Sequence, residues 1–209
     1  MELRKFIATT IREYLNEQHN IENNLNANFS KWFGNSMTIK NGKPLIFHHF
    51  TDNKFNVFDK KTGFNTHLFS TVEANRNSFF FTTDTSFGSQ HGKEKMDVYL
   101  KIENIFNFNE HYYYKDITPI TSDFFDEIVD YIEGNGIDLT MEYQSYRGEL
   151  KIKPEYNWKF FDDKIGEYFV DFLKKNNYDG CYFVEEGSSV YTVFEPNQIK
   201  SIENDGTWD

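Results

Sequence analysis

Two adjacent histidines stand where a short apolar segment becomes polar. Pro44 to Phe47 is typical of a core strand, and His48, His49, Phe50 and Thr51 follow it directly. Imidazole nitrogens donate or accept hydrogen bonds and change charge near neutral pH, so histidines at a strand end suit the binding of a polar ligand. The same side chains could instead satisfy local hydrogen bonds. We expect a strand from Pro44 to Phe47 that presents these four residues at its end.

The sequence around the histidines resembles the opening of the ADP-ribosyltransferase domains of phage polyvalent proteins and prophage toxins. Those domains have a Trp-Phe-Gly-x-Ser turn, followed by a Pro-Leu-led strand that ends in Tyr-His-Gly-Thr. Here residues 32–36 form the turn, 44–47 the strand, and His49 and Thr51 take the His and Thr positions. The resemblance implies an H-Y-E-like member of the poly(ADP-ribose) polymerase superfamily, in which His49 binds the adenosine ribose of NAD and Thr51 helps to hold the nicotinamide amide.

This first motif departs from the family pattern at two positions. His48 stands where the family usually has Tyr, and Phe50 stands where it has Gly. In the wider fold the backbone of that Gly bonds the nicotinamide amide, so the bulky Phe50 is expected to restrict the backbone angles available there.

A second motif follows at a spacing that the family shares. Residues 78–82 resemble its Gly-Phe-Tyr-Phe-Thr strand, and His91-Gly92 lies eleven positions after Phe80 (91 minus 80), where relatives have a second aromatic and a small residue. The resemblance implies that Phe80 and His91 sandwich the nicotinamide ring. Three successive phenylalanines in a strand are also typical of a plain hydrophobic core.

The C-terminal quarter supplies the third motif. Residues 178–180, 191–201 and 206–209 resemble the closing Gly-Tyr-Asp-Gly turn, the Glu-Tyr-x-Val-Phe-Asp-Pro-Asn-Gln-Ile-Lys-Ser strand and the Asn-Gly-Thr-Phe-Asp tail. The resemblance therefore extends over about residues 28–209. Relatives carry a catalytic Glu immediately before the strand Tyr, Tyr191 here, but this chain has Val190.

In the fold that Glu holds the nicotinamide ribose and favours an oxocarbenium-like transition state, which Val190 cannot do. Its loss argues against polymer synthesis more firmly than against transfer of one unit. Glu149, Glu185 or Glu186 could reach the ribose, although each also reads as an ordinary solvated carboxylate. The candidate catalytic residues are His49, Phe80, Glu149, Glu185 and Glu186, and the candidate NAD-binding residues are His48, His49, Phe50, Thr51, Phe80, His91 and Tyr191.

Composition limits the class of protein. The chain has 209 residues, of which 19% are aromatic, enough for one ordinary domain with a real core. A net charge of −11 opposes non-specific adhesion to nucleic acid or anionic membranes. The single Cys181 cannot form an internal disulfide, no apolar run reaches the roughly eighteen residues of a membrane span, and no signal peptide or zinc-ligand spacing is evident. We expect a cytoplasmic protein that needs no metal.

The elements that must position these residues are helices and short strands. Apolar residues at helical spacing predict an N-terminal amphipathic helix from residue 2 to about 18, and a polar linker follows to Asn28, so we divide the chain into 1–27 and a transferase domain, 28–209. Further helices are expected at Ser122 to Ile132 and Asp163 to Lys175, and strands at Asp97 to Ile102 and Glu149 to Ile152.

This order of elements predicts an α+β fold. The resemblance implies two small, mainly antiparallel sheets with NAD in the cleft between them. The segment Asn104 to Pro119, with its three tyrosines, is expected to be a loop that overhangs the cleft.

The predicted function is that of an NAD-dependent mono-ADP-ribosyltransferase that modifies a protein or nucleic acid, as a toxin of a phage, prophage or anti-phage toxin-antitoxin system. NAD would be its substrate, and an antitoxin or phage protein could dock on the N-terminal helix. Phe50 and Val190 keep open a catalytically silent NAD-fold module that binds a partner protein, RNA or DNA. A third possibility is NAD hydrolysis without an acceptor.

Overall fold

The computed structural model describes residues 27–60, 65–66, 74–75, 77–115, 118–139 and 154–204. Several expectations lie outside these residues: the helix at 2–18, most of its linker, the strand Glu149 to Ile152 with the candidate acid Glu149, and the tail at 206–209. The described part is a mixed α+β structure with several sheets, as the sequence predicts.

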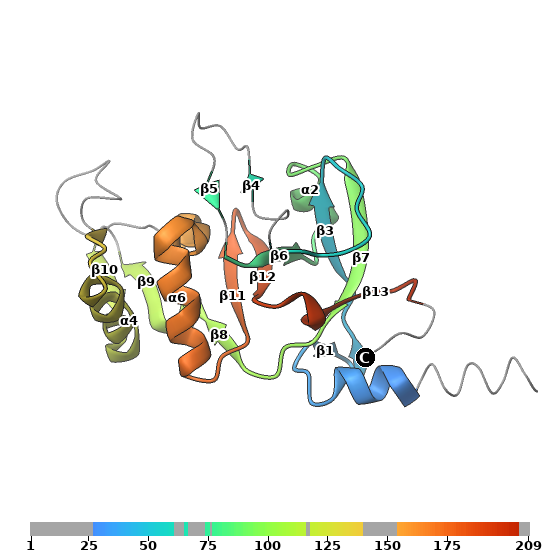
Figure 1. Cartoon of the computed structure of the whole chain (residues 1–209), viewed down its shortest axis with the longest axis horizontal. Coiled ribbons are helices and arrows are strands. Elements are labelled where there is room, and N and C mark those ends of the chain that lie inside the picture. Colours follow the sequence, from blue (N-terminus) through green and yellow to red (C-terminus); the bar gives the residue numbers. More distant parts are fainter. Residues whose placement is uncertain are drawn as a thin grey trace, which may run out of the picture.

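Seven strands form the main sheet, in the order β13-β7-β3-β6-β12-β11-β8 (Figure 1). Strands β11 and β8 pair in parallel, and the other neighbours in this sheet pair antiparallel. The strands are β3 (Phe47–Thr51), β6 (Phe79–Thr82), β7 (Glu94–Leu100), β8 (Ile105–Asn107), β11 (Gly180–Glu185), β12 (Ser188–Val193) and β13 (Ile199–Ser201).

Shorter elements surround this sheet. Residues 27–33 are helical. Three two-stranded pairs are β1 (Ile39–Lys40) with β2 (Lys43–Pro44), β4 (Asn65–Thr66) with β5 (Ala74–Asn75), and β9 (Tyr112–Lys115) with β10 (Thr118–Thr121). The short helices are α2 (Thr85–Gly88) and α3 (Phe108–His111), and the 3-10 helices are η1 (Pro154–Phe161) and η2 (Pro196–Gln198).

The main sheet is almost divided between β3 and β6. Among the described residues these strands share one ladder pair, His48 with Thr82, whereas β3 pairs with β7 along five residues. We call β13, β7 and β3 the histidine half, and β6, β12, β11 and β8 the core half. The described strands thus form one seven-stranded sheet with a single residue pair between its halves, where two small sheets were expected.

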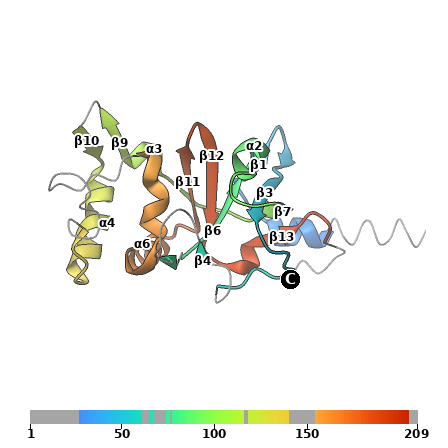
Figure 2. The same cartoon turned by 90° about the horizontal axis from the view of Figure 1, so that it is seen from above.

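Two amphipathic helices lie toward the core half, with α4 outermost (Figures 1 and 2). Helix α4 (Asp123–Gly134) begins where the Ser122 hydroxyl accepts a hydrogen bond from the Phe125 backbone N–H, an ordinary N-cap. Helix α6 (Asp163–Lys175) ends with Lys174 and Lys175, whose charges suit the negative end of the helix dipole. Both helices occur where their apolar periodicity predicts them.

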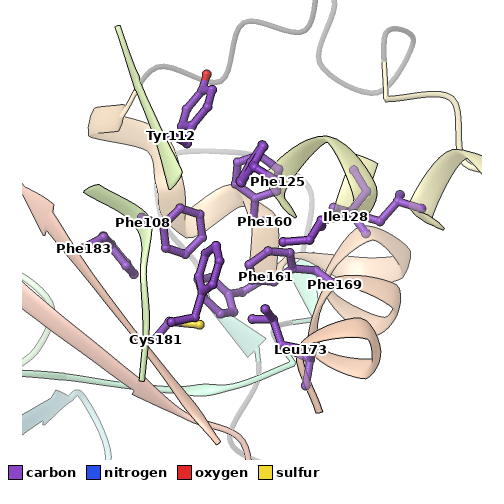
Figure 3. Close-up of a cluster of buried hydrophobic side chains, with 14 of the residues drawn as sticks. Phe108, Tyr112, Phe125, Ile128, Phe160, Phe161, Phe169, Leu173, Cys181 and Phe183 are labelled. Carbon is purple, nitrogen blue, oxygen red and sulfur yellow. The ribbon is translucent and has the colours of Figure 1, made fainter. Parts of the chain in front are cut away.

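The largest hydrophobic cluster fills the space between these helices, η1 and β11 (Figure 3). Phe108, Phe161, Phe169 and Phe183 are fully buried in it, with ring centroids 5.3 Å apart for Phe161 and Phe169. Each such side chain contributes about 1.5–3 kcal/mol on burial. A separate cluster packs on the histidine half and its neighbours, and consists of Phe47, Phe79, Phe81, Val98, Leu100, Ile102, Val193 and Ile199.

The predicted strand from Pro44 to Phe47 is wrong in its position. Pro44 belongs to the two-residue strand β2, and the main-sheet strand begins only at Phe47, the first residue paired with β7. Proline has no backbone N–H and so cannot donate to a ladder, which favours its place on a short edge strand. His48, His49, Phe50 and Thr51 therefore lie within β3 instead of after it.

The predicted loop from Asn104 to Pro119 is also wrong. Strand β8, helix α3 and strand β9 occupy most of it, and β9 pairs with β10. Tyr112 is buried and stacks on Phe125 with ring centroids 4.9 Å apart, whereas Tyr113 is exposed. Successive side chains of a strand point to opposite sides, so Tyr112 of β9 joins the core and Tyr113 lies on the exposed side of the hairpin.

Candidate active site

Strand β3 distributes its polar residues to two faces of the sheet. Successive strand side chains alternate, so His48 and Phe50 share one face and His49 and Thr51 the other. The ring contacts agree, since His48 lies against Phe50, whereas His49 lies against Phe81 of the opposite cluster. The two adjacent histidines therefore have different surroundings and different chemistry.

His49 lies at the division between the two halves of the sheet. Its Nδ1 is 2.9 Å from the backbone oxygen of Phe80, on the neighbouring strand β6. A carbonyl oxygen can only accept, so Nδ1–H donates this bond and Nε2 of the neutral ring is left as an acceptor. Burial lowers the pKa of His49 below its ordinary value of 6.5, more than the bond to Phe80 raises it, which favours the neutral ring.

Two phenylalanines after β3 cover this histidine. The rings of Phe55 and Phe58 lie edge-on to His49, at centroid distances of 5.7 and 5.2 Å. Sequence reasoning missed both residues. Their spacing, two aromatics three residues apart directly after the histidine motif, was a signal that could have found them.

The segment that carries these phenylalanines is anchored at Lys60. Lys60 Nζ lies 2.6 Å from the Glu195 carboxylate, which also pairs with Lys174 of α6. Partial burial raises the pKa of Glu195, but hydrogen bonds from the two lysines outweigh it and the net pKa is lowered. The cover over His49 is thereby tied to η2 and α6.

His48 forms an ion-pair geometry with a carboxylate on β7. Its Nδ1 is 2.7 Å from Asp97 Oδ1, and Lys95 Nζ donates to Asp97 Oδ2 at 2.9 Å. Partial burial raises the pKa of Asp97, but the hydrogen bonds from Lys95 and His48 lower it further, so the net pKa is below its ordinary value. Asp97 was not among the candidate residues, because its partner lies on another strand.

Two glycines allow the segment after β6 to contact β3 closely. A Cβ on Gly88 would lie 2.2 Å from the Phe50 ring, and one on Gly92 would lie 2.3 Å from the Thr51 backbone. Phe50, unusual for the family, thus packs against α2 at a glycine, and it keeps a regular ladder pairing with Lys95. Thr51 itself accepts a hydrogen bond from the Asn53 backbone at 3.3 Å.

The predicted nicotinamide clamp, Phe80 and His91, lies in two environments. Phe80 is partly buried and packs edge-on against Phe161 and Phe183 of the large cluster. His91 is exposed and packs against Phe87, a member of the same cluster. Gly92 brings His91 next to the end of β3. The clamp remains a prediction.

Val190 and Tyr191 point to opposite faces of β12. Val190 is 3% exposed, belongs to the large cluster, and pairs with Thr82 on β6 and Phe183 on β11. Tyr191 packs on Phe47 at 4.9 Å, on the His49 side of the sheet, and burial raises its pKa. Val190, which was predicted to replace a catalytic Glu, is thus part of the hydrophobic core.

The remaining candidate acids lie near the β11–β12 turn. Glu185 pairs with Ser188 and shares the face of Val190 by strand alternation. Glu186 occupies the turn with a φ of 48° and is exposed. Of the two, Glu185 is the better placed toward Val190.

Asp84 is a further carboxylate at this end, and sequence reasoning missed it. It caps α2 by accepting from the Ser86 and Phe87 backbone N–H groups, and it accepts from the Ser188 hydroxyl at 2.8 Å. The Ser188 bond is the main reason that its pKa is lowered. Asp84 therefore fixes α2, which precedes His91, to the β12 strand.

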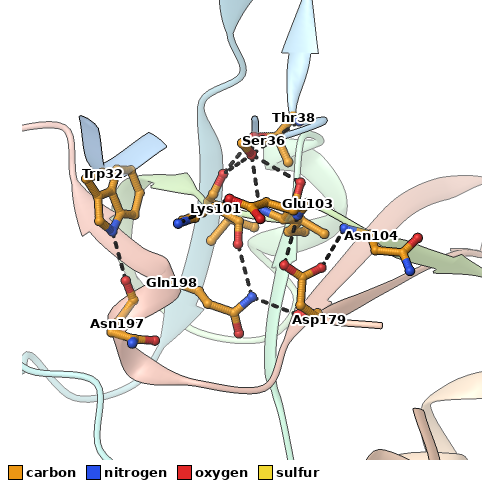
Figure 4. A network of polar contacts seen from close by, with 11 residues as sticks. Trp32, Ser36, Thr38, Lys101, Glu103, Asn104, Asp179, Asn197 and Gln198 are labelled. Atoms are coloured by element: carbon orange, nitrogen blue, oxygen red, sulfur yellow. Dashed lines mark hydrogen bonds and ion pairs between the residues drawn. The ribbon is translucent and has the colours of Figure 1, made fainter. Parts of the chain in front are cut away.

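Several residues of the family-like motifs form a supporting network (Figure 4). Ser36 accepts from the Ile102 backbone at 3.0 Å, and Asp179 accepts from the Glu103 and Asn104 backbones, each at 2.8 Å. Gln198 donates to the Lys101 and Asp179 carbonyls at 3.0 and 2.7 Å. The side chains of these motif residues form hydrogen bonds with backbone groups of neighbouring segments. Their role here is to stabilise the fold that carries the histidines.

The described residues contain no cluster of three His, Cys, Asp or Glu side chains that could hold a metal ion. In the same residues, no helix is both long enough and apolar enough to span a bilayer.

Comparison with known proteins agrees with the motifs. The family described as "ADP-Ribosyltransferase in polyvalent proteins" matches residues 40–208, and no curated protein matches the chain. A solved structure titled "Crystal structure of an anti-CRISPR protein" aligns with 76% of this chain and 95% of its own, at 9% identity and a TM-score of 0.40, which is too low to support an argument. Because the family match spans most of the sequence, the chain belongs to the ADP-ribosyltransferase family of polyvalent proteins.

Proposed function

We propose that the protein is an NAD-dependent mono-ADP-ribosyltransferase with a macromolecular acceptor. The observation that supports it most is the hydrogen bond from His49 to the Phe80 backbone at 2.9 Å. This bond fixes the proton on Nδ1 and leaves Nε2 to accept from a hydroxyl group, as a ribose-binding histidine must. Thr51 and the Phe50 backbone would hold the nicotinamide amide, with Phe80 and His91 on the two faces of the ring.

Transfer of a single unit follows from the environment of Val190. A buried valine in the large cluster cannot stabilise the charge of an extending ADP-ribose hydroxyl. NAD activation would then depend on orientation, with Glu185 as the best-placed candidate carboxylate. We expect one ADP-ribose per modified site, and mass spectrometry of the acceptor tests this directly.

The acceptor class is tested with labelled NAD. Lysate is split into protein and nucleic-acid fractions, each fraction receives the protein with labelled NAD, and the fraction that retains label contains the acceptor. His49→Ala is the matched control, since its weaker NAD binding should reduce the label in both fractions. Free ADP-ribose without labelled macromolecule would instead indicate NAD hydrolysis.

A toxin role is the physiological part of the proposal. Modification of an essential macromolecule should arrest growth when the protein is produced in a bacterial host, and His49→Ala should relieve the arrest. Equal toxicity of both proteins at equal abundance would count against an NAD-dependent toxin. A protein that docks on the N-terminal segment and restores growth would identify the antitoxin.

A catalytically silent binding module is the second candidate, favoured by two observations. Phe50 occupies a position where the family motif has Gly, and its ring packs on Gly88 of α2. Val190 is buried in the hydrophobic core. NAD binding without nicotinamide release, in every fraction tried, would select this candidate.

A further inference from the structure

Residues 52–60, which follow β3, form an irregular segment that we call the strap. They belong to no helix or strand, and Phe55 and Phe58 are the only members that are not exposed. Both rings contact His49 edge-on, at centroid distances of 5.7 and 5.2 Å, and they contact each other at 4.9 Å. The inner side of the strap is thus directed at the histidine that the proposed function assigns to NAD.

Phe58 also attaches the strap to the hydrophobic cluster of the sheet. Its ring lies 5.5 Å from that of Phe79 and 5.7 Å from that of Phe81, both of which are buried. Val57, between the two phenylalanines, is 74% exposed. The strap therefore has an apolar inner side and a solvent-facing outer side, and burial of the two rings favours the closed position.

An ion-pair network holds the far end of the strap. Lys60 Nζ lies 2.6 Å from one oxygen of Glu195, and Lys174 of α6 pairs with the other oxygen. We call these three side chains the latch. The Lys60 and Glu195 side chains are 42% and 41% exposed, and a partly exposed pair of this kind shifts an equilibrium by only a few-fold. The latch is therefore weak enough to open.

The closed strap leaves no room for a nucleotide between its rings and His49. A sugar placed there would need two contact distances of about 3.5–4.0 Å each, whose sum exceeds the ring separations of 5.2 and 5.7 Å. A cavity of about 340 Å³ is lined by Lys174 and Glu195, but neither His49 nor any strap residue lines it. In this conformation the strap occupies the outer side of His49.

We propose that the strap is an autoinhibitory device, held shut by the latch, which must open before NAD reaches His49; this inference rests on the proposed transferase function. The protein then exists as a closed and an open form, and NAD binds the open form. The apparent affinity for NAD is reduced by the fraction of molecules that are open. Any change that weakens the closed form alone should therefore strengthen NAD binding.

The closed form is tested first without NAD. Diethyl pyrocarbonate reacts with unprotonated imidazole nitrogen, and mass spectrometry of peptides measures the reaction at each histidine. His91 is exposed and serves as the internal reference. In the wild-type protein His49 should react about tenfold or more slowly than His91, because an open form of this kind is a minor population. Equal rates at the two histidines would overturn the closed strap.

Lys60→Gln opens the latch and removes little volume. It should raise both the modification rate of His49 and the calorimetric NAD affinity by about two- to fivefold. Lys54→Gln is the matched control, because Lys54 lies on the same strap, is 82% exposed and is 3.4 Å from Glu94, outside the latch. It removes the same charge near an anionic ligand and should change neither quantity. A lower NAD affinity in Lys60→Gln than in Lys54→Gln would overturn the inhibitory role.

Phe58→Ala removes one of the two covering rings. It should raise the modification rate of His49 by about tenfold or more, since a lost aromatic contact weakens the closed form strongly, and NAD affinity should rise with it. Val57→Ala, on the exposed side of the strap, should leave both unchanged. Thermal unfolding checks that Phe58→Ala is folded, and Lys60→Gln decides the question if it is not.

The outcomes separate this inference from the function on which it rests. If the wild-type protein transfers ADP-ribose and NAD affinity is the same in all four variants, the strap is not inhibitory and the proposed function stands. If Lys60→Gln and Phe58→Ala release His49 to modification and yet no protein binds NAD, the strap closes as described, but the proposed function and the inhibitory role are both overturned.

Discussion

The two halves of the sheet differ in their hydrophobic packing and in the polar side chains that they carry. The core half is backed by α4, α6 and η1, and phenylalanine rings fill the space between them. The histidine half carries paired polar groups within its ladder, His48 with Asp97 and His49 facing the division. The larger of the two hydrophobic clusters therefore lies against the core half, and it includes Val190, whereas the paired histidines lie in the other half.

The largest change in stability should come from removing a buried ring in the core half. Phe169 is fully buried among aromatic rings, so Phe169→Ala should lower the free energy of unfolding by about 3–5 kcal/mol. Urea denaturation measures this, with Tyr113→Ala as the control because Tyr113 is 47% exposed. Equal losses in the two variants would contradict a concentration of stability in the aromatic cluster.

A glutamate at Val190, the proposed position of a family acid, should destabilise the core half. Val190→Glu places a carboxyl in hydrophobic surroundings, so its pKa should rise and the free energy of unfolding should fall by about 1–3 kcal/mol. Val190→Gln is the uncharged control. Stability that falls further in Val190→Glu than in Val190→Gln as pH rises would show the cost of charge, whereas a stable Val190→Glu with faster NAD hydrolysis would mean that the site is polar.

Replacing His49, the proposed ribose-binding histidine, should weaken NAD binding without unfolding the protein. His49→Ala should cost about 1–3 kcal/mol in NAD affinity, the price of a lost partner for a desolvated polar group. Calorimetric NAD affinities of His49→Ala and His48→Ala show which of the two histidines binds NAD. A larger loss of affinity in His48→Ala would mean that the two histidines have exchanged roles.

The contact between Phe50 and Gly88 can be tested by a double-mutant cycle. Gly88→Ala would drive a Cβ into the Phe50 ring and should cost about 1–3 kcal/mol of stability, while Gly88→Ala with Phe50→Ala should recover most of it. Additive losses in thermal or urea unfolding would show that the ring is not seated on the glycine.

The smallest effect concerns pH. Protonation would turn the Nε2 acceptor of His49 into a donor, and its pKa lies below the ordinary 6.5. NAD affinity should therefore stay constant from pH 8 to 6.5 and decline only at lower pH. The stability contribution has the same sign: it is full above 6.5 and is lost as pH falls toward the folded-state pKa. Calorimetry at several pH values checks both, and a decline centred above 6.5 would refute the assignment.

The elements best predicted from the sequence were those that local patterns determine. Helices α4 and α6 follow from apolar residues at helical spacing with a cap or terminal lysines. The start of β3 could not be predicted, because Phe47 begins the strand only through pairing with Val98 on a strand far along the chain. Tyr112 was placed in a loop for the same reason, since its burial depends on Phe125 of α4.

The site was predictable only in part. The histidine motif identified His48 and His49, but not that they face different partners. Asp97 and Asp84 were missed because each acquires its chemical setting from another strand: Asp97 from His48 and Asp84 from Ser188. The motifs predicted the family, whereas the surroundings of each polar group depend on pairing between strands that lie far apart in the sequence.

The division of the sheet helps to determine which ring nitrogen of His49 carries the proton. Among the described residues β3 and β6 share one ladder pair, His48 with Thr82, and the Phe80 carbonyl accepts a hydrogen bond from the His49 side chain of β3. The backbone gap thus selects the tautomer. A ladder that continued to Phe80 would release Nδ1 of His49 from this carbonyl, so the backbone would no longer fix which ring nitrogen carries the proton.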